Sequence, residues 1–213
     1  MNESSFGCLI GALLDGDHAA AVAAVRKLCA AGVDPEMVVT AGIEKAMSRL
    51  DEKCTVEHFN LLEIMLAGRA VGAVIKEIYP NGRPPGAGKH ALAIATLEGD
   101  VHELGKNIVK SVLSAKGYRI TDCGKNCSLE RLVHTAEREG VQAVLISGLI
   151  TSVIPQVRQV RSALTAKGLA GLKVLAGGAV LKQASAEDLK VDYVAQTAFD
   201  GAHYLDETIG ART

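Results

Sequence analysis

Asp100 and His102 are the residues of this 213-residue chain whose types and spacing most readily support chemistry. They follow a short apolar run, 91–97, and only Val101 separates them. Residues two apart in an extended loop point the same way, so the Asp100 carboxylate can reach one ring nitrogen of His102 while the other nitrogen faces a ligand. A carboxylate behind an imidazole is common around metal-bound histidine. The alternative is plainer: Asp100 caps the helix that begins at Leu104, and His102 is a solvated loop residue.

Two further motifs follow other apolar runs, namely Ser147-Gly148-Leu149-Ile150-Thr151 and Gly177-Gly178. Each also has a plain explanation, because Ser147 or Thr151 could cap a helix and the two glycines could simply turn the chain. The first motif, Asp100 to Gly105, has the pattern DxHxxG, and the other two have the patterns SxL (147–149) and GG (177–178). The occurrence of all three in this order in one chain is a more demanding condition than any of them alone.

The second half of the chain must position these motifs, and there apolar runs alternate with helical stretches. The pattern predicts a doubly wound, flavodoxin-like (Rossmann-like) sheet of five parallel strands, with ligands at the carboxyl ends of the strands, near the switch point between the first and third. The predicted strands are 91–97, 119–123, 143–147, 173–176 and 193–195, and the predicted helices are 104–116, 129–139, 153–166, 185–189 and 201–209.

The first half of the chain has a helical pattern. Capping residues and apolar spacing predict helices over 6–14, 18–31, 35–50 and 56–78, joined by short loops, which favours a four-helix bundle. Three of the five prolines fall within 80–88. We therefore predict a helical domain over 1–80, a linker over 81–89 and an α/β domain over 90–213.

Composition narrows the class of protein. The formal net charge is −1 and aromatic residues make up 3% of the chain, so we expect no nucleic-acid partner. The five cysteines form no CxxC pair, which is typical of reduced thiols. No apolar run is long enough to span a membrane, and the first residues lack the basic start of a signal peptide. We expect a cytoplasmic protein without a membrane partner.

The three motifs together resemble the signature of the cobalamin-binding domain shared by methionine synthase, corrinoid methyl-carrier proteins and adenosylcobalamin mutases. The helical half is similar to the cap of the methyl-transferring branch. The resemblance implies bound cobalamin in its base-off/His-on form, in which His102 replaces the cofactor's own base on cobalt and Asp100 supports His102. The cofactor-binding residues that it implies in the three motifs are Asp100, Val101, His102, Glu103, Leu104, Gly105, Ser147, Gly148, Leu149, Thr151, Gly177 and Gly178.

The resemblance also implies contacts outside these motifs. Tyr193, Ala195 and Phe199 are expected to line the far wall of the slot for the nucleotide tail. Phe59, Leu62 and Met65 of the last cap helix are expected to shield the upper face of the corrin ring, although residues so spaced could equally be bundle core.

By the same resemblance, the protein is a carrier that needs partner enzymes. It accepts a methyl group on Co(I) (cob(I)alamin) from a substrate-specific methyltransferase. It then passes the group from methylcobalamin to an acceptor such as tetrahydrofolate through a second methyltransferase, and a reductive activation protein restores it. Methylamines or methoxylated aromatics (O-demethylation) are the expected donors. The alternatives are a subunit of an adenosylcobalamin mutase, which the helical cap argues against, and a cobalamin-dependent sensor, which would need a DNA-binding module.

Two departures from the family pattern stand out. Val153 occupies the place where methionine synthase has a serine that extends the His-Asp relay, and Ser152 could replace that serine only if the loop shifts by one residue. After the second strand, Gly124-Lys125-Asn126-Cys127 replaces a Gly-x-x-Val-Pro-like turn.

Overall fold

The computed structural model describes residues 6–53, 61–80 and 90–209. The chain divides into two compact units, residues 1–89 with 111–118 and residues 90–110 with 119–213. The predicted linker, 81–89, lies outside the described residues, and its boundaries stay a prediction.

The first unit is a bundle in which α2 (His18–Ala30) packs against both α1 (Gly7–Leu14) and α5 (Leu61–Ile78). The Asp17 side chain caps α2 by accepting a hydrogen bond from the Ala20 N–H at 2.9 Å. Arg26 of α2 and Glu77 of α5 form a bidentate salt bridge, in which Nε and Nη2 donate to the two carboxylate oxygens at 2.8 and 3.1 Å. Residues 54–60, where the longest helix was predicted to begin, lie outside the described residues.

The predicted helix 35–50 is not one regular helix, and this prediction was wrong in detail. It consists of α3 (Pro35–Met37), a π-helical turn (Val38–Ile43) and α4 (Glu44–Lys53). A π turn contains one more residue than a regular helical turn. The additional residue here allows both residues 38–39 and residues 42–43 to be buried. Gly42 permits the close approach to α1, because a Cβ there would lie 2.8 Å from Leu9 Cδ2.

The second unit contains the predicted parallel sheet, in the flavodoxin-like order β2-β1-β3-β4-β5. Its central strands are built from small and β-branched apolar residues and are buried along nearly their whole length, as expected for a sheet covered on both faces. The fold class is therefore confirmed. The strands are β1 (Ala91–Ala95), β2 (Arg119–Asp122), β3 (Ala143–Ser147), β4 (Lys173–Gly177) and β5 (Tyr193–Ala195).

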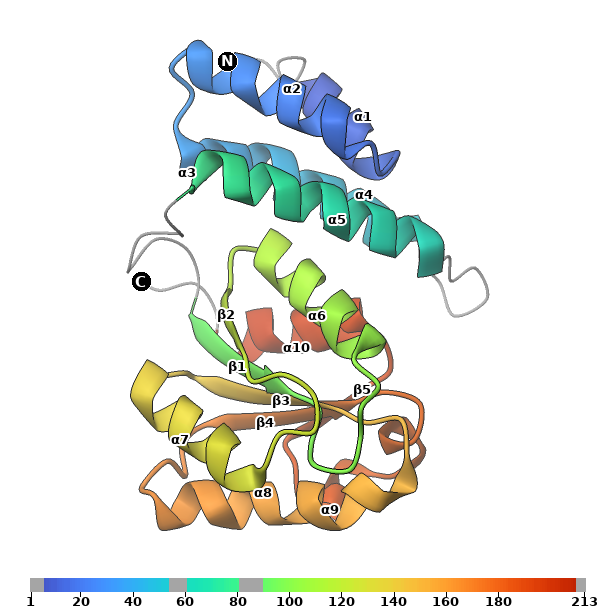
Figure 1. Cartoon of the computed structure of the whole chain (residues 1–213), viewed down its shortest axis with the longest axis vertical. Helices are drawn as coiled ribbons and strands as arrows, with labels where there is room; N and C mark the ends of the chain where they lie inside the picture. Colours follow the sequence, from blue (N-terminus) through green and yellow to red (C-terminus); the bar gives the residue numbers. More distant parts are fainter. Residues whose placement is uncertain (1–5, 54–60, 81–89, 210–213) are drawn as a thin grey trace. The chain divides into compact units, whose positions relative to one another are not determined.

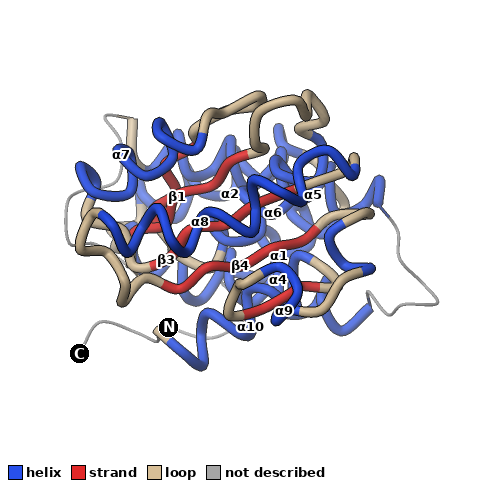
Figure 2. The backbone as a smooth tube through the Cα atoms, turned by 90° about the horizontal axis from the view of Figure 1, so that it is seen from below, coloured by secondary structure: helices blue, strands red, loops and turns tan. Residues whose placement is uncertain are grey.

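Helices cover both faces of this sheet. Figure 1 shows α6 (Leu104–Ala115) and α10 (Ala198–Thr208) over one face, with α7 (Leu129–Glu139), α8 (Ile154–Ala166) and α9 (Ala186–Leu189) over the other. In Figure 2 the second group lies in front of the strands. Short 3-10 turns, Thr151–Val153 and Leu181–Gln183, follow β3 and β4. No helix in the described part of the chain is long and apolar enough to cross a membrane.

A buried ion pair joins the start of α6 to the end of β2. The Lys106 side chain is 2% exposed, and its Nζ donates to both carboxylate oxygens of Asp122 at 2.7 Å. Lys110, which is 43% exposed, adds a longer bond to the same carboxylate. Burial raises the pKa of Asp122, but these lysines and the Gly124 N–H outweigh burial and hold the pKa below its ordinary value.

We expect Lys106→Met to lower the free energy of unfolding by about 3 kcal/mol, because it leaves the Asp122 carboxylate without its buried partner. Urea denaturation would measure the loss. The matched control, Lys110→Met, removes an exposed partner and should cost less than about 1 kcal/mol. The pKa of Asp122 is depressed in the folded state, so the pair stabilises the protein above the ordinary aspartate pKa. The difference in the free energy of unfolding between wild type and Lys106→Met should therefore shrink as pH falls. A difference that does not depend on pH would contradict this account.

Candidate functional site

The carboxylate of Asp100 is the centre of the site. It is fully buried in the loop between β1 and α6 and is bound from two directions. Its Oδ1 accepts the His102 N–H at 2.9 Å and lies 2.8 Å from His102 Nδ1, while its Oδ2 accepts the Leu149 N–H at 2.7 Å. An ionised carboxylate can only accept, so Nδ1 carries the proton and Nε2 of the neutral ring keeps its lone pair. The His102 side chain is half exposed, which leaves it accessible to a ligand.

The hydrogen bonds also set the charge of Asp100. Burial alone raises the pKa of a carboxyl group, but the N–H donors of Leu149 and His102 outweigh burial, and the pKa of Asp100 lies below its ordinary value. The carboxylate is therefore ionised at neutral pH and fixes the orientation of the imidazole.

The loops after β3 and β4 pack backbone against backbone. The Gly148 N–H donates to the Gly177 oxygen at 2.9 Å. Gly178 has a φ of +99°, and a Cβ there would lie 2.5 Å from the Gly148 oxygen. Gly178 must therefore be a glycine at this contact, while Gly177 contributes its main-chain oxygen. The structure thus brings the SxL and GG motifs together.

A strip of small residues runs between the sheet and the helices α6 and α10. A Cβ on Gly105 would lie 3.2 Å from Ser147 Oγ, and a Cβ on Gly177 would lie 3.3 Å from the Ala195 oxygen. Gly201 of α10, which the sequence analysis missed, completes the strip, because its Cβ would lie 3.2 Å from the Cβ of Ala195. An added side chain on any of these glycines would fill space that a narrow ligand could otherwise use.

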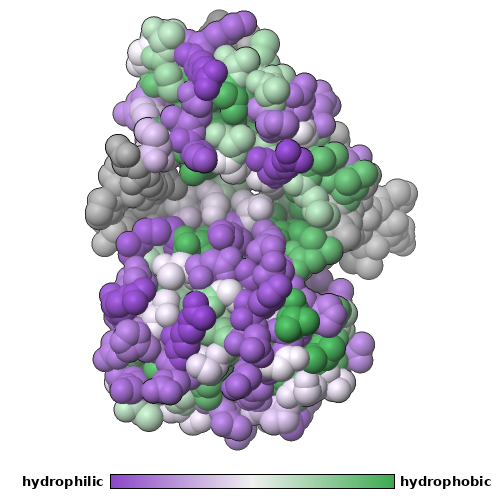
Figure 3. Space-filling model, in the orientation of Figure 1, coloured by the Kyte–Doolittle hydropathy of each residue, from purple (hydrophilic) through white to green (hydrophobic). Residues whose placement is uncertain are grey.

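Exposed apolar side chains belong to the motif that carries His102 and Asp100 and to the loop whose Leu149 N–H binds Asp100. Among the described residues of the second unit, the exposed large hydrophobic side chains are Val101, Leu104 and Leu149. All three belong to the DxHxxG and SxL motifs. Figure 3 shows hydrophobic surface on the side of this unit where the loop between β1 and α6 lies. This apolar surface around one imidazole suits a broad ligand that places a metal over the ring nitrogen.

The loop after β3 supplies no hydroxyl to Asp100. Within the described residues, neither Thr151 nor Ser152 hydrogen-bonds to this carboxylate. Val153 is fully buried, and its side chain would lie 3.0 Å from a Cβ on Gly148. The residue at the relay position therefore packs the loop. Glu103 is exposed, and its carboxylate lies 4.0 Å from Lys125 Nζ.

The residues predicted for the far wall have different surroundings. Ala195 lies beside Gly177 in the strip. The Tyr193 hydroxyl donates to Asp200 Oδ1 at 2.6 Å and its ring stacks on Tyr204, so Tyr193 is engaged with α10. The bond to Asp200, together with burial, raises the pKa of Tyr193 to about 12. Phe199 is buried on α10. Contact of these three residues with a ligand stays a prediction.

Of the predicted cap residues, Phe59 lies outside the described residues. Leu62 and Met65 are exposed on α5, as is Leu66 one residue further along. These residues are therefore not bundle core, and the ligand that they were predicted to cover stays a prediction.

The comparisons with known proteins agree on one family. The pattern of the B12 binding domain matches residues 91–203. Trimethylamine corrinoid protein 1 of Methanosarcina mazei is 28% identical over 193 residues, 89% of each chain. Dimethylamine corrinoid protein 2 of the same organism is 30% identical over 181 residues, 83% of this chain and 84% of that protein.

Solved structures show the same fold. The methanol:cobalamin methyltransferase complex MtaBC from Methanosarcina barkeri contains a chain with a TM-score of 0.85 at 21% identity, covering 100% of this chain and 82% of that chain. A novel cobalamin-binding protein from Desulfitobacterium hafniense DCB-2 has a TM-score of 0.74 at 24% identity, covering 96% and 97%.

We expect Gly178→Ala to be strongly destabilising, because it adds a clash with the Gly148 oxygen to the strain of a left-handed backbone. The matched control is Gly168→Ala, where φ is +76° and no atom lies within 4 Å of the added Cβ. The control should cost about 1–2 kcal/mol for the backbone alone, and Gly178→Ala about 1–3 kcal/mol more for the clash. Urea denaturation would measure both, and equal losses would show that the two loops do not depend on this contact.

Proposed function

The chain belongs to the B12-binding domain family, and on that premise we propose that it is a corrinoid protein that carries a methyl group between partner methyltransferases. The observation that carries the proposal is the buried Asp100 carboxylate, which binds Nδ1 of a half-exposed His102 and leaves Nε2 as the free ring nitrogen. An oriented imidazole of this kind is what an axial ligand to a metal requires.

The residues present fit cobalamin. In this proposal His102 would bind cobalt in place of the cofactor's own base, Asp100 would hold the ring tautomer, and Val101, Leu104 and Leu149 would contact the corrin. We place the displaced nucleotide tail along the strip of small residues formed by Gly105, Gly177, Gly201 and Ser147. Bound cobalamin supplies a cobalt centre that can accept and release a methyl group.

The comparisons favour a methyl carrier over the two alternatives. Several relatives that match about nine-tenths of this chain are named as methylamine corrinoid proteins. The methyl donor that we propose is a methylamine, delivered by a substrate-specific methyltransferase. The similarity to a chain of a methanol methyltransferase complex supports a partner of that class. A second methyltransferase, with tetrahydrofolate as acceptor, and a reductive activation protein complete the proposed system in the cytoplasm.

We expect His102→Ala to remove the protein ligand from cobalt. The readout is the electron paramagnetic resonance spectrum of the Co(II) form, prepared with protein labelled with ¹⁵N-histidine. In wild type the axial nitrogen comes from the protein, so labelling should convert each triplet splitting to a doublet. His102→Ala should show no such change and should bind hydroxocobalamin more weakly.

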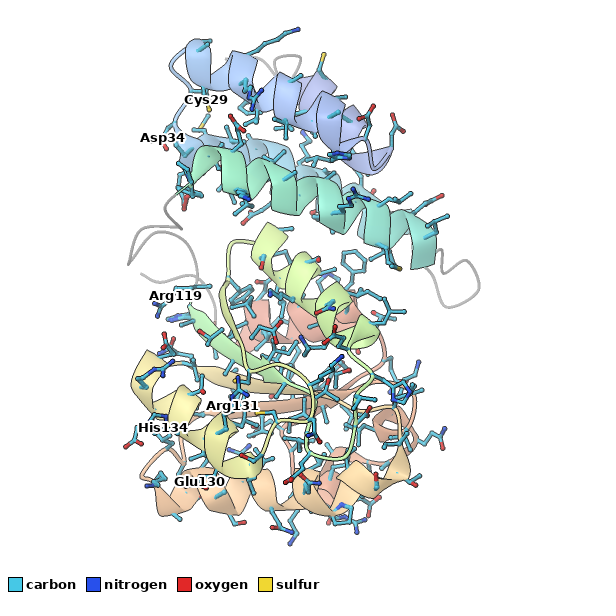
Figure 4. The ribbon with its side chains drawn as sticks, viewed as in Figure 1. Cys29, Asp34, Arg119, Glu130, Arg131 and His134 are labelled. Atoms are coloured by element: carbon cyan, nitrogen blue, oxygen red, sulfur yellow. The ribbon has the colours of Figure 1, made fainter. Side chains whose placement is uncertain are left out.

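The matched control is His134→Ala. His134 is exposed on α7, which covers the opposite face of the sheet from α6 (Figure 4). The control should give the spectrum and affinity of wild type. A wild-type protein whose spectrum is unchanged by labelling, or equal effects of the two substitutions, would contradict the proposed ligand.

Methyl transfer from a methylamine to the cobalamin-loaded protein tests the proposed function. Reduced, cobalamin-loaded protein should become methylated when a methylamine and a methylamine methyltransferase are supplied together, and it should stay unmethylated when either is omitted. Absorbance spectroscopy follows the change, and chromatography of the acid-released cofactor identifies the group. The control is His102→Ala, which should be methylated more slowly. Release of an adenosyl cofactor from protein purified from its native host would favour the mutase alternative.

A further inference from the structure

Asn126, in the loop between β2 and α7, holds the loop that carries Asp100 and His102. Its side-chain Oδ1 accepts the Gly99 N–H at 2.7 Å, and its own N–H donates to the Asp100 oxygen at 3.0 Å. One residue thus binds two consecutive residues of the neighbouring loop, Gly99 and Asp100, and only Val101 separates them from His102. Asn126 belongs to the turn, Gly124-Lys125-Asn126-Cys127, that departs from the family pattern.

The backbone of Asn126 is shaped for this contact. Its φ is +50°, a left-handed conformation that asparagine adopts more readily than other residues with a side chain. The two loops also pair on either side of Asn126. The Thr96 N–H donates to the Gly124 oxygen at 3.1 Å, and the Cys127 N–H donates to the Thr96 oxygen at 2.9 Å. The turn at residues 124–127 therefore binds the loop that precedes His102 at several successive points.

We infer that Asn126 is a positioning residue for His102, an inference that rests on the proposed function. The Asp100 carboxylate orients the imidazole, and the main chain of Asp100 is held by the Leu97 oxygen on one side and the Asn126 N–H on the other. Gly99, with a φ of +89°, is the residue at which this loop turns, and its N–H is fixed by the Asn126 side chain. Loss of Oδ1 frees that turn, and the carboxylate no longer holds the ring in one place.

Positioning can be separated from folding at this residue. Gly99 and Asn126 are both exposed, so water can replace the lost hydrogen bond and the protein stays folded. The Lys106–Asp122 pair and the Gly148–Gly178 contact do not use the Asn126 side chain, and we expect both to remain. A loss of order in the loop, with unchanged stability, is therefore the signature of a positioning role.

Three variants test the inference. Asn126→Gly keeps the left-handed backbone and removes the acceptor, while Asn126→Asp keeps both and should rescue. Lys190→Gly is the matched control, because Lys190 is an exposed residue with a φ of +56° at the end of α9, just before β5 and so at the other end of the sheet from His102. Urea denaturation confirms that all three are folded.

The first readout uses the protein without cofactor. Hydrogen exchange at the Gly99 amide should accelerate about fivefold in Asn126→Gly, which corresponds to about 1 kcal/mol, and should stay within twofold of wild type in Asn126→Asp and Lys190→Gly. The second readout uses the cobalamin-loaded Co(II) protein. The fraction with a ¹⁵N-histidine signature should fall in Asn126→Gly alone.

The outcomes separate this inference from the proposed function. A wild-type protein without the histidine signature would overturn the proposed function, whatever Asn126 does. A wild-type protein with the signature, and an Asn126→Gly protein identical to it in both readouts, would overturn the positioning role alone. The same loss in Lys190→Gly as in Asn126→Gly would also overturn that role, since the effect would then not depend on the contact with Gly99.

Discussion

The site depends on a carboxylate that is buried and yet charged. Taking Asp100 out of water is unfavourable, and the structure offsets that cost with N–H donors from two loops, at His102 and at Leu149. These loops follow β1 and β3, which are neighbours in the sheet although β2 lies between them in the chain. Only a sheet in which the first strand pairs with the third brings the two donors to one carboxylate. The sheet therefore holds the carboxylate that orients the imidazole.

The glycines extend this coupling to the third loop. Gly178 lies against the backbone of Gly148, next to the Leu149 N–H that binds Asp100. The loops after β1, β3 and β4 are thus linked by main-chain contacts, which are less free to rearrange than contacts through long side chains.

The parallel sheet and the Asp100–His102 contact could both be predicted from the sequence, because both depend on local patterns. The sheet is indicated by runs of buried residues, and the contact by a spacing of two residues. It was not sufficient for contacts set by strand register. Lys106 and Asp122 are 16 residues apart and Gly99 and Asn126 are 27 apart. These pairs meet only because β1 and β2 align Ala91 with Arg119. The π-helical turn was missed for a related reason, since its buried pairs reflect packing against α1.

The position that the family resemblance assigns to a relay serine holds Val153, which is buried and apolar. Val153 has no hydroxyl that could bond to the Asp100 carboxylate. Among the described residues, the only titratable side chain bonded to Asp100 is His102, and the remaining donors are main-chain amides, which do not exchange protons on the timescale of a side chain. Asp100 itself is buried. Within the described residues, the contact with His102 is therefore the one side-chain contact that joins this carboxylate to the half-exposed part of the site.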